Sequence, residues 1–168
     1  MRLTTFTDYA LRVLLVLASE PTRRATIDTI AMDFDISATH LMKVSLVLGR
    51  TGWVETIRGR NGGMRLAVDP STLRLGQMVQ QLESDFALVE CFAPDGNCLL
   101  AGGCGLEVAF SRAYEAFMSE LDQVTLADLL RTTTSLGKLP SWQPIKGPVS
   151  ARAAKTSARR AMPGHRAR

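Results

Sequence analysis

The segment from Thr26 to Leu66 constrains the fold most, because two short helical patterns are followed there by a glycine-rich hairpin. Thr26 is a good N-cap for the first helix, and Ser37, after a turn at Asp35 and Ile36, is a good N-cap for the second. The residues predicted to face inward from these two helices are Ile27, Ile30, Ala31, Phe34, Leu41, Val44 and Leu48. Two short strand-like segments then follow, joined by a glycine-rich loop, which is the pattern of a β-hairpin. We therefore predict a mainly α fold, a winged helix-turn-helix with a short β-hairpin as its wing.

The second helix of such a motif enters the major groove of DNA, so its outward-facing polar residues are candidates for contacts with base edges. These candidates are Ser37, Thr39, His40 and Lys43. The glycines of the wing loop allow close approach of the backbone to phosphates or to the minor groove. The wing candidates are Arg58, Arg60 and Asn61. The hairpin alone would equally fit a solvated loop with ordinary surface charges, whereas its combination with the two helices favours double-stranded DNA as the partner.

Four more helical patterns complete the chain. Apolar residues over 6–18 form two adjacent stripes, so this helix is expected to be buried on more than one side. A helix over 75–82 leads into a loop that contains all three cysteines. Apolar residues over 106–124 recur near the 3.5-residue spacing of a helix that packs lengthwise on a partner, which predicts a long dimerisation helix in a homodimer. A last short helix is capped by Thr125 and runs through Leu130.

These elements divide the chain into four predicted parts. Residues 1–82 form a winged helix-turn-helix DNA-binding domain, and residues 83–105 form the cysteine loop. Residues 106–136 supply the dimerisation helix and the C-terminal helix. Residues 137–168 form a basic tail, rich in Pro, Ser, Ala and Arg, that is expected to be disordered when free.

The net charge of +4 is distributed unevenly along the chain. Residues 1–66 carry nine Lys and Arg against six Asp and Glu, and residues 67–137 carry three against ten. Residues 138–168 carry eight against none. Nucleic acid is therefore expected to meet the front and the tail rather than the middle. The apolar run over 13–18 is too short to span a bilayer, so we expect a cytoplasmic protein without a membrane partner.

Cys91, Cys98 and Cys104 are spaced C-x6-C-x5-C in a loop without periodicity. An odd number fits poorly with a closed set of disulfides, and gaps longer than those of structural zinc sites suit a bulkier ligand. An iron-sulfur cluster is held by thiolates and can leave one iron with a labile non-cysteine ligand. We predict such a cluster, [4Fe–4S] rather than [2Fe–2S]. The alternatives are small buried side chains, against which the polar loop composition argues, or a redox-active thiol group.

The fourth ligand is not a neighbouring histidine, because the chain has only His40 in the predicted recognition helix and His165 in the tail. Carboxylates remain as alternatives, and the residues themselves single none of them out. They are Asp8, Glu83, Asp85, Glu90, Asp95 and Glu107. No nucleophile–base pair, phosphate-binding loop or substrate-pocket motif is apparent, so an enzyme is not expected.

Residues 1–136 resemble the iron-sulfur winged-helix transcriptional repressors. The motifs that carry this resemblance are Met1–Thr4 with Thr7–Arg12, the wing run Arg58–Gly63, the three-cysteine loop, and Thr125–Leu129. The cluster-assembly regulators of this group have a histidine three residues after the third cysteine, where this chain has Glu107. The chain is more similar to the nitrite-sensitive, nitric-oxide-sensing branch.

In that branch, an aspartate of the first helix ligates the cluster of the opposite subunit, and Asp8 falls on this position within Thr7–Tyr9. The resemblance therefore implies Asp8 as the fourth ligand, supplied by the partner subunit. It also implies a dimeric repressor that loses affinity for its DNA operator when nitric oxide nitrosylates the cluster. The run Glu90–Phe92 also resembles an iron-responsive relative. An iron-responsive or thiol-redox-sensing repressor of the same fold is therefore the alternative.

Overall fold

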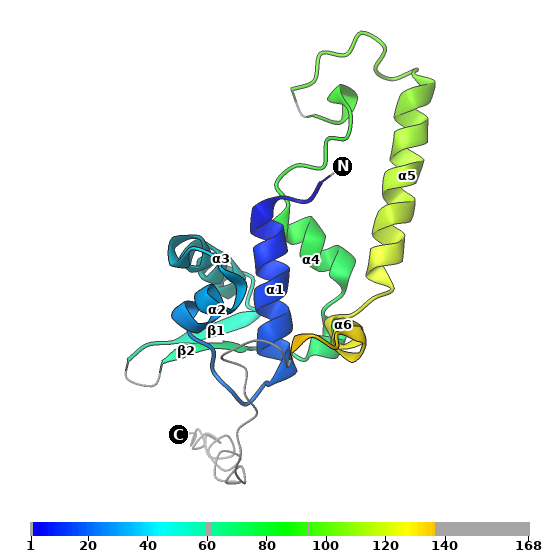
Figure 1. Cartoon of the computed structure of the whole chain (residues 1–168). Helices are drawn as coiled ribbons and strands as arrows, with labels where there is room; N and C mark the ends of the chain where they lie inside the picture. Colours follow the sequence, from blue (N-terminus) through cyan, green and yellow to red (C-terminus); the bar gives the residue numbers. More distant parts are fainter. Residues whose placement is uncertain (1, 60–61, 94, 137–168) are drawn as a thin grey trace, which may run out of the picture.

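The computed structural model describes residues 2–59, 62–93 and 95–136, and it is mainly helical with one hairpin (Figure 1). The helices are α1 (Thr5–Ser19), α2 (Ile27–Phe34), α3 (Ala38–Arg50), α4 (Leu75–Leu82), α5 (Gly105–Asp122) and α6 (Leu126–Thr132). The strands are β1 (Val54–Ile57) and β2 (Gly63–Leu66), and two 3-10 turns lie at Pro70–Thr72 and Glu90–Phe92. The winged helix-turn-helix prediction is confirmed. The predictions for Arg60, Asn61 and the tail over 137–168 lie outside the described residues.

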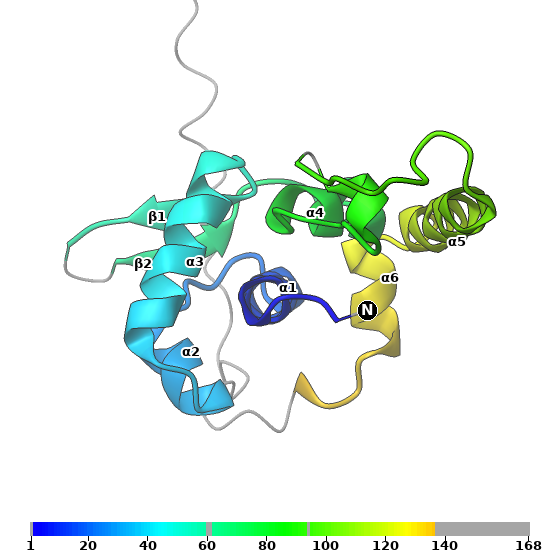
Figure 2. The same ribbon diagram turned by 90° about the horizontal axis from the view of Figure 1, so that it is seen from above.

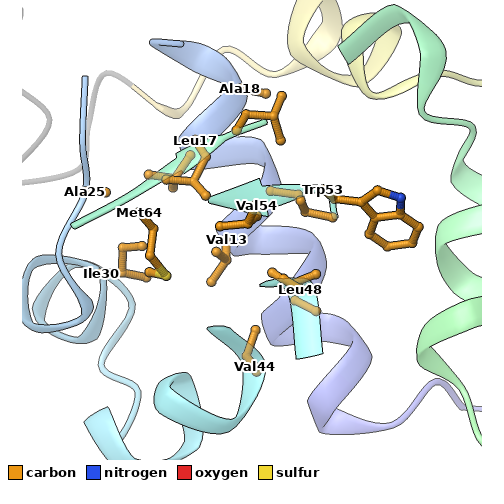
Figure 3. Close-up of a cluster of buried hydrophobic side chains, with 14 of the residues drawn as sticks. Val13, Leu17, Ala18, Ala25, Ile30, Val44, Leu48, Trp53, Val54 and Met64 are labelled. Atoms are coloured by element: carbon orange, nitrogen blue, oxygen red, sulfur yellow. The ribbon is translucent and has the colours of Figure 1, made fainter. Parts of the chain in front are cut away.

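The core is built around α1. Seen down its axis, α1 has α2, α3 and the hairpin on one side and α4, α5 and α6 on the other (Figure 2). Its buried residues are Thr7, Ala10, Val13, Leu14, Val16, Leu17 and Ala18. They include neighbours on several sides of the helix, which confirms the prediction from the two apolar stripes. Figure 3 shows side chains of α1, α3 and the hairpin gathered in this core.

Side-chain caps fix the two helices of the helix-turn-helix. Thr26 begins α2 with a capping box, in which its hydroxyl accepts from the Thr29 amide and the Thr29 hydroxyl accepts from the Thr26 amide. Asp35 ends α2 in the left-handed conformation at φ 52°, which aspartate tolerates better than most residues. Ser37 then caps α3. Each residue of the turn therefore adopts a conformation that its type favours, and the turn fixes the orientation of α3 relative to α2.

The hairpin pairs Val54 with Leu66 and Ile57 with Gly63, so both strands are in antiparallel register beside α3. Ala25, just before α2, joins the sheet through an isolated bridge to Met64, with backbone hydrogen bonds of 2.9 and 2.7 Å. The wing is thus anchored to the helix-turn-helix at its base.

The long helix differs from its prediction at one end. The apolar spacing carries it to Val124, but α5 ends at Asp122. Two contacts draw the chain away there: Arg74 Nη1 donates to the Asp122 carbonyl at 2.6 Å, and the Leu75 amide donates to the Val124 carbonyl at 2.8 Å. A Cβ at Gly76 would collide with the Asp122 side chain, so glycine permits this close approach of α4 and α5.

Toward its other end, α5 rises past α4 to the level of the cysteine loop (Figure 1). None of its residues is buried, although α1, α3 and α4 each bury several. Among the described residues, no helix is both long enough and apolar enough to cross a membrane.

Candidate nucleic-acid interface and cysteine loop

The exposed face of α3 is the first part of the candidate site. Leu41, Val44 and Leu48 are fully buried against the core, so the opposite side of the helix is free to meet another molecule. The 100° step between successive residues places a set of exposed residues along this outer face. The set is Thr39, Met42, Lys43, Leu46 and Arg50. We call it the outer stripe of α3.

The four candidates for base contacts have different surroundings. Thr39 and Lys43 are exposed in the outer stripe. Ser37 precedes it, and its hydroxyl oxygen accepts from the His40 amide at 3.5 Å as the helix cap. His40 is exposed at the edge of the stripe, where its ring lies 6.3 Å from that of Tyr9 in α1. The structure therefore brings Thr39 and Lys43 together on one surface and sets His40 to the side.

Two members of the outer stripe escaped the sequence prediction because they are apolar. Met42 and Leu46 expose 52% and 57% of their surface. A search for polar outward residues passes over them, although their helical positions relative to Thr39 and Lys43 place them on the same face. Arg50, at the end of the stripe, was missed as well. Within the described residues, neither Lys43 nor Arg50 forms an ion pair.

The described part of the wing adds another exposed cation. Arg58 is exposed where β1 gives way to the wing loop. Arg65, in contrast, is held across the hairpin by Glu55, with its Nη2 at 2.7 Å from the carboxylate. The wing therefore presents Arg58 rather than Arg65 to a polyanion.

The cysteine loop is the second part of the candidate site, and it connects α4 to α5. Cys91 lies in the 3-10 turn at Glu90–Phe92, and Cys104 is the N-cap of α5, with Cys98 between them. All three are free thiols, half-buried rather than packed in a core. Partial burial raises the pKa of the Cys91 thiol, and the nearby Glu107, Cys98 and Cys104 raise it further. The neutral thiol of Cys91 is thus favoured over the thiolate, and a metal that binds this sulfur would displace the proton.

The donor chemistry of this loop fits an iron-sulfur cluster, because thiolates are the ligands that such clusters take. The loop carries three free thiols, and the other two are near enough to Cys91 to raise the pKa of its thiol. One of the three, Cys104, lines a cavity of about 340 Å³ together with Glu107 and Phe92, among other residues. In the described ranges, no three His, Cys, Asp or Glu side chains are close enough together to hold a metal ion.

The candidate carboxylates lie in different settings. Asp8 is half-exposed on α1 and pairs with Arg12 at 2.7 Å, and the Arg12 guanidinium lies 5.8 Å above the ring of Phe34. Glu107, in the first turn of α5, accepts from the Gly102 amide of the cysteine loop at 2.9 Å. Asp85 accepts from the Ala87 amide at 2.6 Å. Glu90 and Asp95 are exposed in the loop.

Glu83 is the exception among them, with only 9% of its surface exposed at the end of α4. Its Oε1 accepts from both the amide (2.7 Å) and the hydroxyl (3.1 Å) of Thr4, which is the N-cap of α1. This pair joins the start of the cysteine loop to the start of α1. The sequence gives no signal for it, since the two residues are far apart in the chain.

A winged helix-turn-helix whose second helix presents an unburied, cationic face defines a DNA-binding regulator. Residues 3–132 match the Rrf2 family, described as an iron-dependent transcriptional regulator, and the chain belongs to this family. The HTH-type transcriptional regulator NsrR of Geobacillus kaustophilus is 49% identical over 141 residues, covering 83% of this chain and 96% of that protein. The NsrR of Bacillus subtilis is 45% identical over 141 residues, covering 83% and 97%.

The fold agrees with this assignment. The structure of CymR, the global cysteine regulator of B. subtilis, has a TM-score of 0.64 and 25% identity, and covers 79% of this chain and 98% of that one. These relatives are transcriptional regulators and not enzymes.

Proposed function

We propose that the chain is a homodimeric repressor that senses nitric oxide through an iron-sulfur cluster. Cys91, Cys98 and Cys104 would hold the cluster together with Asp8 of the partner subunit. The observation that carries this proposal is the placement of three half-buried free thiols on one loop, directly after the buried Glu83 that is bonded to α1. Nitric oxide as the signal is taken from the resemblance to the nitric-oxide-sensing branch, and the two NsrR relatives support the role of a transcriptional regulator.

Binding to an operator is assigned to α3 and the wing. Ser37, Thr39, His40 and Lys43 would meet base edges, and Arg58, Arg60 and Asn61 would meet phosphates or the minor groove. The exposure of Thr39, His40, Lys43 and Arg58 supports this assignment. Residues 1–82 then serve as the DNA-binding domain, and the tail over 137–168 adds attraction to phosphates that does not depend on sequence.

The dimer contact is assigned to α5, within residues 106–136. Its exposed face carries Leu106 and Phe110, with Ala113 between Phe110 and the half-buried Phe117. A helix that has no fully buried residue within its own chain gains stability when this face is covered by a second copy. Two copies joined along α5 would present two α3 helices to the two halves of a near-palindromic operator.

The route from the cysteine loop to DNA runs through α1. When bound, the cluster supplies iron that reacts with nitric oxide and a ligand position that a carboxylate fills. Asp8 in that position would tie α1 of one subunit to the cysteine loop of the other. A second partner for Asp8 already exists in its own helix, because Arg12 lies at 2.7 Å. A half-exposed ion pair is worth about 1 kcal/mol or less, so Asp8 can exchange partners at small cost.

Loss of this tie would act on α3, which packs against α1. Freed from the partner's cysteine loop, the two DNA-binding domains would no longer hold their α3 helices at the operator spacing. A hundredfold loss of affinity corresponds to about 2.7 kcal/mol, within the usual range for coupling between sites.

An iron-responsive repressor is the second candidate, favoured by the family description as an iron-dependent regulator. It would use the same cysteines and the same α3 surface. Its operator affinity would fall when the cluster is lost under iron limitation, rather than when nitric oxide is added.

The proposal is tested by anaerobic purification followed by visible spectroscopy and native mass spectrometry during nitric-oxide titration. The expected result is a dimer whose mass includes an iron-sulfur cluster and whose visible absorbance changes in proportion to added nitric oxide. Cys98→Ala should lack both the absorbance and the added mass. A protein without iron that forms a disulfide on oxidation would instead identify a thiol sensor.

A further inference from the structure

The outer stripe of α3 contains two large apolar side chains that are exposed to solvent. Met42 and Leu46 are one helical turn apart and expose 52% and 57% of their surface. The buried side of α3 is already filled by Leu41, Val44 and Leu48. The chain therefore leaves about half of the surface of Met42 and of Leu46 uncovered, and this apolar surface is available to a ligand.

The charges around this pair indicate the kind of ligand. Lys43 lies beside Met42 and Arg50 follows Leu46 by one turn, and within the described residues neither cation has an ion-pair partner. Arg58 of the wing adds a third exposed cation. An apolar protein surface would leave these charges without partners. DNA supplies phosphates for the cations and also apolar groups for Met42 and Leu46. The apolar groups of the major groove are the C5-methyls of thymine.

We propose that Met42 and Leu46 are specificity-determining residues that contact thymine C5-methyl groups in the major groove. This assignment rests on the proposed placement of α3 in DNA and adds which bases it prefers. Four residues along a helix span about 6 Å, a little under two base-pair steps. The two side chains therefore recognise thymines that lie within two base-pair steps of each other in each half-site. Sites that carry A·T pairs there are preferred over sites with G·C pairs.

The test removes the methyl group alone. The full-length wild-type protein selects duplexes from a random-sequence library, and each thymine of the selected site is then replaced singly by deoxyuridine. At one or more positions the wild-type protein should bind about fourfold more weakly, as expected for loss of one buried methyl-sized group. Met42→Ala or Leu46→Ala should bind the thymine and deoxyuridine duplexes equally at the position that its side chain contacts.

Met32→Ala is the matched control, because Met32 is also an exposed methionine (72%) but lies on α2. It should keep the full wild-type discrimination. Equal binding of thymine and deoxyuridine duplexes by the wild type at every position would overturn the assignment. So would unchanged discrimination in both Met42→Ala and Leu46→Ala. A library from which the wild type enriches no sequence would contradict sequence-specific DNA binding itself, which separates failure of the proposed function from failure of the thymine contact alone.

Discussion

The DNA-binding half of the molecule buries many of its side chains, whereas the half formed by the cysteine loop and α5 leaves most of its side chains exposed or half-buried. Around α1, Leu14 and Leu17 of α1 and Val44 and Leu48 of α3 are completely buried, so this half is stabilised by its own chain. The 18 residues of α5 bury none of their side chains, and the cysteine thiols are half-buried. The second half is therefore completed by something outside the chain, which we assign to the partner subunit and the cluster.

The largest expected effect is a difference in unfolding free energy between alanine variants of two leucines, one in each half. Leu17→Ala should lower the free energy of unfolding by about 3 kcal/mol at any protein concentration, because it opens a cavity in the core. Leu106 is 65% exposed on α5. Leu106→Ala should therefore lower the free energy of unfolding far less in dilute protein, where no second copy covers this side chain. Denaturant titrations at two protein concentrations measure both. Equal losses for the two variants in dilute protein would show that α5 belongs to the core.

A smaller effect is expected at the proposed dimer face. Phe110→Ala should weaken dimerisation about tenfold, as loss of a buried aromatic side chain at an interface does. Ser119 is exposed on the opposite side of α5 and provides the control, since Ser119→Ala should leave the dimer unchanged. Analytical ultracentrifugation reports the dissociation constant. A dimer weakened by Ser119→Ala and not by Phe110→Ala would place the contact on the other face.

The next effect concerns the hydrogen bonds between Glu83 and Thr4, which join the two halves. Glu83→Gln keeps an oxygen acceptor for Thr4 but removes its charge, so the tie should weaken by about 1 kcal/mol. Amides of the first turn of α1 should then exchange about fivefold faster in the cluster-free protein. Asp85→Asn is the control, because Asp85 accepts from the Ala87 amide of its own loop rather than from α1. Exchange rates that are identical in Glu83→Gln and the wild type would contradict a tie between the cysteine loop and α1.

The smallest effect concerns the tail. Truncation after Gly137 removes eight basic and no acidic residues. Dimerisation and sequence preference should be unchanged, while the dependence of DNA affinity on salt concentration becomes shallower. Fluorescence anisotropy over a range of salt concentrations measures the slope. Loss of sequence preference on truncation would instead make the tail a reader of DNA.

Local signals were sufficient to predict most of the fold. Thr26 and Ser37 are N-caps in the structure because their hydroxyls bond to amides three residues ahead, a short-range effect that residue type reveals. The end of α5 could not be predicted, since Arg74 bonds to the carbonyl of Asp122 from a distant part of the chain. The Glu83–Thr4 bond was hidden for the same reason.

The candidate site was predicted less completely than the fold. Residue chemistry made the cysteines candidates, and helical position made Thr39 and Lys43 candidates that are exposed in the structure. Met42 and Leu46 were missed because apolar residues are ordinarily assigned to the core, and only the filled inner side of α3 shows that they face outward. A ligand from a partner subunit leaves no pattern within one chain, so Asp8 depended on a resemblance alone.

The central claim is that the cysteine loop controls DNA binding, and the most direct test is operator affinity before and after nitric oxide. The duplex selected by the wild-type protein is titrated anaerobically with the cluster-loaded dimer, with and without stoichiometric nitric oxide. We predict about a hundredfold weaker binding after nitric oxide, and no such response in Cys98→Ala. An unchanged dissociation constant in the wild type, or an equal response in Cys98→Ala, would contradict the account.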